Sequence, residues 1–245
     1  MNRMALLIVV SDSLGLPRPF EGVYYKDTYP SLIQEQWKER YNFIHLAKGG
    51  GTARELLDIT FNAMSYYAHE VVGLICHFGI VDASPRALLP AEIQAIDRIL
   101  GPSQPLKNII SQHHAEITET RGYPTLTTSE EFQLILKEIT RFSTSYGFPI
   151  AFLGIAPCAG NMQKQCPSFN QVQRVAYNKV ITNAMSGSSS LKYIEPPISE
   201  QSSSEMLLTD GHHLSCQGHL QYAKAISGWI EAISLDKGSP DVTKF

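Results

Sequence analysis

Three residues that could together perform nucleophilic catalysis stand near the two ends of this sequence. Ser13 follows an apolar run in VVSDSLGLPR, and Asp210 and His213 are three residues apart in LLTDGHHLSCQGH. Acyl transfer through a serine needs a hydroxyl, a base that accepts its proton, and a group that orients the base. The short spacing lets the Asp210 carboxylate reach the imidazole of His213, which leaves the other ring nitrogen free to face Ser13. We therefore predict a Ser13–His213–Asp210 triad, with His212 as the competing base.

The oxyanion that forms when a hydroxyl attacks a carbonyl needs preorganised hydrogen-bond donors. The backbone N–H groups of Ser13 and Gly50 are candidates, because glycine lets the backbone approach a ligand closely. Gly50 lies in the run KGGGT, which could instead be a phosphate cradle or a flexible turn before a helix. The run lacks the lysine ending of a P-loop and the full G-x-G-x-x-G spacing, so a phosphate site is the less favoured interpretation.

The elements that must bring these residues together alternate between strands and helices. Apolar runs predict strands over 5–10, 42–46, 71–78, 149–155 and 191–194. Helical periodicity and capping signals predict helices over 31–40, 52–67, 90–100, 128–146, 168–185 and 215–233. Residues 101–128 show no clear pattern. Such an alternation predicts a parallel sheet that is covered by helices on both faces.

An open parallel sheet binds its ligands outside the carboxyl ends of the strands. The loops that follow the five predicted strands contain Ser13, Gly50, the segment 79–86, the segment 157–160 and His213. All five loops should open on one edge of the sheet. The two ends of the proposed triad can therefore meet there.

These loops resemble the four sequence blocks of the SGNH (GDSL) hydrolases, in the same order. Ser11-Asp12-Ser13-Leu14 resembles the G-D-S-L block with Ser11 in place of glycine, and Gly50-Gly51-Thr52 resembles the second block. Residues 79–82 lie where the third block, G-x-N-D, belongs, and residues 210–213 match the final D-x-x-H. The resemblance implies a flavodoxin-like three-layer α/β/α sandwich with a five-stranded parallel sheet. It also implies a serine esterase or acyltransferase without metal or cofactor, acting on a small acyl ester such as an O-acetylated carbohydrate.

The third block departs from the family at Val81, where the family has an asparagine that donates to the oxyanion. Losing one such donor typically lowers the rate by about 10² to 10³. Arg86 and His77 are the candidates to replace it, and we favour Arg86 because GIVDASPR resembles a variant third block. We expect Asp82 and His77 to contact substrate. The alternative is a weakened or inactive binding protein on the same scaffold.

Composition limits the remaining function classes. The 245 residues, 43% of them hydrophobic, predict one domain over 1–245 with a flexible tail over 236–245. The net charge of −3 without charged blocks argues against a nucleic-acid partner and against a membrane surface. A zinc site from His212, His213 and His219 and a flavin- or nucleotide-binding protein are weaker alternatives, because neither has the expected motif spacing. No feature indicates an oligomeric state.

The cellular location follows from the cysteines and from the first apolar run. Four cysteines without CxxC spacing indicate reduced thiols in a cytoplasmic protein. The apolar run over residues 4–10 is much shorter than the roughly 20 residues that span a bilayer. A secretory signal is the competing interpretation of this run.

Overall fold

Five parallel strands form the centre of the structure, in the order β2-β1-β3-β4-β5. The structure is a computed structural model and describes residues 4–236 of the chain. The strands are β1 (Ala5–Ser11), β2 (Tyr41–Ala47), β3 (Val71–His77), β4 (Ile150–Leu153) and β5 (Leu191–Ile194). Ser11, the last residue of β1, pairs with Ala47 of β2 and with His77 of β3. These three strands therefore end level with one another at the carboxyl edge.

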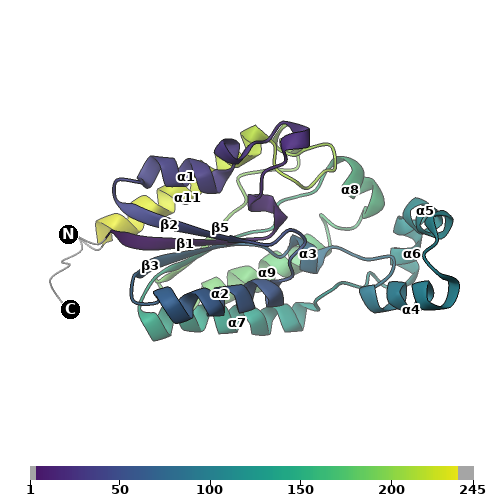
Figure 1. The fold of residues 1–245 in the computed structure, drawn as a ribbon, viewed down its shortest axis with the longest axis horizontal. Helices are drawn as coiled ribbons and strands as arrows, with labels where there is room; N and C mark the ends of the chain where they lie inside the picture. The colour runs from purple at the N-terminus through teal and green to yellow at the C-terminus, as the bar shows by residue number, and fades with distance from the viewer. Residues whose placement is uncertain (1–3, 237–245) are drawn as a thin grey trace.

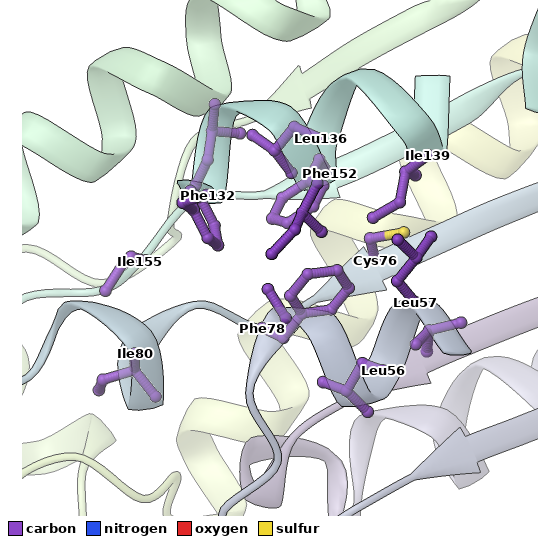
Figure 2. Packing of buried hydrophobic residues seen from close by; sticks show 14 of the residues in the cluster. Leu56, Leu57, Cys76, Phe78, Ile80, Phe132, Leu136, Ile139, Phe152 and Ile155 are labelled. Carbon is purple, nitrogen blue, oxygen red and sulfur yellow. The ribbon is translucent and has the colours of Figure 1, made fainter. Parts of the chain in front are cut away.

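Helices cover both faces of this sheet, so the predicted three-layer α/β/α sandwich is confirmed (Figure 1). One face carries α1 (Tyr29–Trp37) and α11 (Cys216–Asp236), and the other carries α2 (Ala53–Tyr67), α7 (Ser129–Tyr146) and α9 (Gln173–Met185). Alternate side chains of the strands enter the two layers. Figure 2 shows the core under α2 and α7, where aromatic and aliphatic side chains interlock: Leu56, Leu57, Phe78, Phe132 and Phe152.

Shorter elements join these layers, and several stand at the carboxyl edge. The structure contains the 3₁₀ turns η1 (Ser13–Gly15), η2 (Pro19–Glu21) and η3 (Tyr25–Asp27), and the helices α3 (Ile80–Ala83), α4 (Pro90–Leu100), α5 (Gln104–Gln112), α6 (His114–Thr120), α8 (Gly160–Gln165) and α10 (Ser203–Met206). Helices α4–α6 project beyond the layers as an arm (Figure 1). The segment 101–128, which had no clear sequence pattern, thus contains two short helices.

Two predicted boundaries differ from the structure for identifiable reasons. Helix α1 begins at Tyr29 and takes Pro30 into its first turn, where proline loses no hydrogen bond. Helix α9 begins at Gln173 instead of at 168. The segment before it is held as a turn because the Asn170 side chain binds both the backbone N–H and the carbonyl of Cys158, at 2.7 and 2.9 Å.

Two further expectations concern the ends of the chain and membranes. The expected tail begins at Asp236, the last residue of α11, and the rest of it lies outside the described residues. Among residues 4–236, no helix combines the length and the apolar character needed to cross a bilayer.

Candidate active site

Ser13 lies at the carboxyl edge of the sheet because β1 ends two residues before it. It is the first residue of η1, and Asp12 caps this turn by accepting a hydrogen bond from the Leu14 N–H at 2.9 Å. The Asp12 carboxyl group is completely buried, and burial raises its pKa to about 7. The hydroxyl of Ser13 is thus presented by a short turn that is anchored in the core.

Ser11 replaces the glycine of the family motif, and the structure shows where its side chain fits. Its Oγ lies 2.8 Å from Nε2 of His45 on the neighbouring strand. A Cβ at Gly15 would lie only 2.2 Å from this oxygen. The absence of a side chain at Gly15 therefore leaves the room that the Ser11 hydroxyl occupies.

The three predicted triad residues meet in hydrogen-bonding order. Nε2 of His213 is 2.9 Å from Oγ of Ser13, and Nδ1 of His213 is 2.6 Å from Oδ2 of Asp210. The other Asp210 oxygen accepts the backbone N–H groups of His212 and His213, each at 3.1 Å. Partial burial opposes ionisation of Asp210, but these hydrogen bonds outweigh it and hold the pKa well below the ordinary value. An ionised Asp210 can therefore fix the tautomer of His213.

The loop that carries Asp210 and His213 depends on a glycine between them. Gly211 has a φ of +85°, and a Cβ there would lie 1.7 Å from the carbonyl oxygen of Ala159. The carbonyl of Gly211 accepts the Ala159 N–H at 2.8 Å. The loop is thereby held against the start of α8, with the imidazole directed at Ser13.

The two backbone oxyanion donors that we predicted are unengaged. Within residues 4–236, the N–H groups of Ser13 and Gly50 have no protein acceptor, whereas the N–H of Gly51 donates to the Lys48 carbonyl at 3.0 Å. Gly50 has a φ of +66°, and the space where a Cβ would stand is open. Both free N–H groups follow strands that end at the same edge.

Arg86 lies beside Val81, as the variant third block suggested. Its Nη2 donates to the Val81 carbonyl at 3.3 Å, and its Nε is buried without a partner among the described residues. The backbone N–H of Arg86 donates to the Pro124 carbonyl at 2.8 Å. The guanidinium is therefore held against the Val81 backbone and keeps a buried Nε–H without a partner among the described residues.

The structure does not bring Asp82 or His77 to the surface of the site. Asp82 is completely buried and accepts the backbone N–H of Ala53, at 3.0 and 3.1 Å from its two oxygens, so it anchors the start of α2. His77 is 1% exposed, lies 3.2 Å from the hydroxyl of Tyr29 and stacks on Tyr222. Burial lowers its pKa to about 3. We correct both assignments: these side chains support the site from the interior and do not face a substrate.

Arg18 is a site residue that the sequence interpretation missed. Its Nη2 contacts both ring nitrogens of His213 and lies 3.8 Å from Oδ2 of Asp210. The one available signal is that Arg18 is the first cationic residue after Ser13. Which way its side chain turns depends on the packing of residues 207–214, far away in the sequence.

A metal could contact only part of the predicted histidine cluster. Asp210, His212 and His213 offer ligand atoms within 4.8 Å of one another. Both nitrogens of His213 are engaged by Ser13 and Asp210, so an ion here would compete with the triad. His219 is separate from this group, because its Nδ1 accepts the backbone N–H of Tyr29 at 3.1 Å.

A cavity of about 520 Å³ opens near the end of β5 but does not contain the triad. Its walls come from Pro157, Arg174 and the segment 195–202. Two of the residues that line it, Arg174 and Glu200, form an ion pair at 3.1 Å. We therefore identify the site from the triad and not from cavity size.

Comparison with known proteins shows that this fold is shared with solved esterases. No protein-family model and no curated protein sequence matches the chain. A lipase/acylhydrolase from Enterococcus faecalis is similar in structure, with a TM-score of 0.62 and 14% identity over 94% of this chain and 96% of its own. The acetyl xylan esterase AlAXEase has a TM-score of 0.60 and 12% identity over 92% and 99% of the two chains. A Desulfitobacterium hafniense protein described as lipolytic and of the G-D-S-L family has a TM-score of 0.59 and 12% identity over 91% and 98%.

Proposed function

We propose that this chain is a serine esterase or acyltransferase of the SGNH type. The observation that carries the proposal is the hydrogen-bonded series from Ser13 through His213 to Asp210. It lies at the carboxyl edge of a sheet whose fold is shared with solved esterases and lipases. Fold similarity at this level of identity does not define an activity, so the proposed activity depends on the geometry of the site.

The geometry supports the following mechanism. Oγ of Ser13 attacks the ester carbonyl while Nε2 of His213 takes the hydroxyl proton, and Asp210 stabilises the imidazolium that results. The developing oxyanion accepts the N–H groups of Ser13 and Gly50, and Arg86 supplies the donor that Val81 cannot. His213 then protonates the departing alcohol. Water hydrolyses the acyl-enzyme, or a second alcohol accepts the acyl group.

The substrate we propose is a small acyl ester, with an O-acetylated carbohydrate as the leading class. Support comes from the acetyl xylan esterase among the structural neighbours. The site surroundings are compatible with a small group, since His213 is only 6% exposed. We keep a cytoplasmic location as part of the proposal, because Cys76, Cys158, Cys166 and Cys216 are all free.

Labelling and turnover of the same purified protein test the proposal. A phosphonofluoridate should attach to Ser13, and hydrolysis of p-nitrophenyl acetate should disappear in Ser13→Ala and His213→Ala. Ser65→Ala and His69→Ala are matched controls, because both residues are exposed and lie on or beyond the distal half of α2. A folded protein with no adduct on Ser13 and with equal rates in all four variants would refute the proposal.

The alternative, a non-catalytic binding protein, has one specific observation in its favour. Val81 stands where the SGNH pattern has an asparagine that donates to the oxyanion. Arg86, the proposed replacement, already donates one hydrogen bond to the Val81 carbonyl. This alternative predicts no turnover of any small acyl ester and no phosphonate adduct. The labelling experiment therefore distinguishes the two functions.

A further inference from the structure

Arg18 places a positive charge directly against the proposed catalytic base. Its Nη2 contacts both ring nitrogens of His213. Both nitrogens already have partners, Ser13 on one side and Asp210 on the other. Arg18 therefore lies beside the imidazole without replacing either partner.

The backbone that carries Arg18 is held firmly in place. We call residues 16–23 the strap. Arg18 and Val23 form an antiparallel bridge across it, with N–H···O distances of 2.7 and 3.0 Å, and Val23 is buried. Prolines 17 and 19 flank Arg18 and restrict the chain further. The position of the arginine is thus set by the strap.

The charge of Arg18 is poorly matched by its surroundings. Its two carboxylate neighbours, Glu21 at 3.6 Å and Asp210 at 3.8 Å, lie beyond the roughly 2.7–2.9 Å of a charge-assisted hydrogen bond. The near oxygen of Asp210 is also taken by His213. One third of the Arg18 side chain is exposed, so a molecule bound from solvent can reach its donors.

Arg18 is a cation beside the triad, 3.8 Å from the Asp210 carboxylate. An anionic group on the substrate would neutralise Arg18 and engage its planar fork with two hydrogen bonds. A neutral ester would leave these donors without an anionic partner.

We propose that Arg18 is a specificity-determining residue that binds a carboxylate or phosphate carried by the ester substrate close to its scissile bond. The inference rests on the proposed esterase function and narrows its substrate class to anionic esters. An ester with an acidic group near its scissile bond therefore fits this side of the site.

Matched acetate esters test the proposal. 4-Acetoxybenzoate and 4-acetoxyphenyl phosphate carry the anion, and methyl 4-acetoxybenzoate is the neutral partner. Arg18→Gln should lower kcat/KM for at least one anionic ester, relative to the neutral one, by about 10- to 100-fold. The anionic ester whose kcat/KM falls more shows whether Arg18 prefers a carboxylate or a phosphate. Arg18→Lys keeps the positive charge but loses the planar pair of donors. Its anionic-to-neutral ratio of kcat/KM should therefore lie between those of wild type and Arg18→Gln.

Arg141→Gln is the control, since Arg141 is exposed on α7 near the end of that helix, which leads to the start of β4 at the opposite edge. It should leave all three rates unchanged. Equal anionic-to-neutral ratios in wild type, Arg18→Gln and Arg141→Gln would overturn the proposal. Thermal melting curves confirm that each variant is folded.

Binding to a Ser13→Ala protein separates this proposal from the esterase function. Calorimetry should detect 4-acetoxybenzoate or 4-acetoxyphenyl phosphate binding to Ser13→Ala, and the affinity should fall at least tenfold in Ser13→Ala/Arg18→Gln. If wild type hydrolyses no ester but the two variants still differ in affinity, the esterase function is refuted and the anion site is supported. If hydrolysis depends on Ser13 but neither anion binds through Arg18, the anion site alone fails.

Discussion

Nε2 of His213 lies 2.9 Å from Oγ of Ser13, although 200 residues of sequence separate them. The contact joins the end of the first strand to the loop before the last helix. Its other side is fixed by Asp210, which holds Nδ1 at 2.6 Å. This series of three groups makes the following outcomes measurable.

Asp210→Asn should lower kcat for p-nitrophenyl acetate by about 10⁴, because an amide stabilises neither the required tautomer nor the imidazolium. Removing the carboxylate also leaves the His212 and His213 N–H groups with a weaker acceptor. Steady-state kinetics measure the effect, and circular dichroism checks the fold. A loss of less than tenfold in a folded variant would mean that Asp210 does not orient the base.

Arg86→Met should lower kcat by about 10² to 10³ with little change in KM, because an oxyanion donor acts in the transition state. Introducing Val81→Asn into this variant should recover part of the loss, since it supplies the donor that the family pattern has at that position. A purely structural Arg86 would instead lower the melting temperature, and the added asparagine would rescue nothing.

Asp12→Asn should change how stability depends on pH. Burial raises the pKa of Asp12 from 3.8 to about 7, so folding favours its protonated form. The stability that this group contributes is complete below about pH 4 and is lost as the pH rises to about 7, a change of a few kcal/mol. Urea unfolding at pH 5 and pH 8 measures it.

An asparagine cannot ionise, so the difference between wild type and Asp12→Asn should vary over this range. Burial lowers the pKa of His45, His77 and His219. The stability that these histidines contribute is lost as the pH falls, which is opposite to the pH dependence of Asp12. Their contribution is the same in both proteins and cancels in the difference. A constant difference from pH 5 to pH 8 would contradict the prediction.

Gly211→Ala should destabilise the protein by roughly 1–3 kcal/mol or more and should reduce kcat as well. The added Cβ would clash with the Ala159 carbonyl at 1.7 Å, in a backbone conformation with φ of +85°. Gly228→Ala is the control: a Cβ there meets nothing within 4 Å, and alanine favours the helix by about 1 kcal/mol. Thermal melting of both variants should therefore show opposite shifts.

The sequence by itself determined the alternation of strands and helices and the edge of the sheet at which chemistry could occur. Apolar runs and caps are local features: Thr52 with Glu55, and Thr128 with Glu131, mark the starts of α2 and α7 as their residue types require. The parallel-sheet rule then placed Ser13, Gly50 and His213 together. The weak pattern in 101–128 concealed α5 and α6 because, of all their residues, only the polar Thr118 is buried, so neither helix contributes a buried apolar face.

Only the tertiary structure decided which way the polar side chains of these loops turn. Asp82 and His77 follow or end the same strand, yet packing against α2 and Tyr222 encloses them both in the interior. Arg18 shows the reverse, since no sequence motif marks it and the strap sets its charge against His213. Backbone periodicity is set by neighbouring residues, whereas the direction of a loop side chain depends on contacts between segments far apart in the chain.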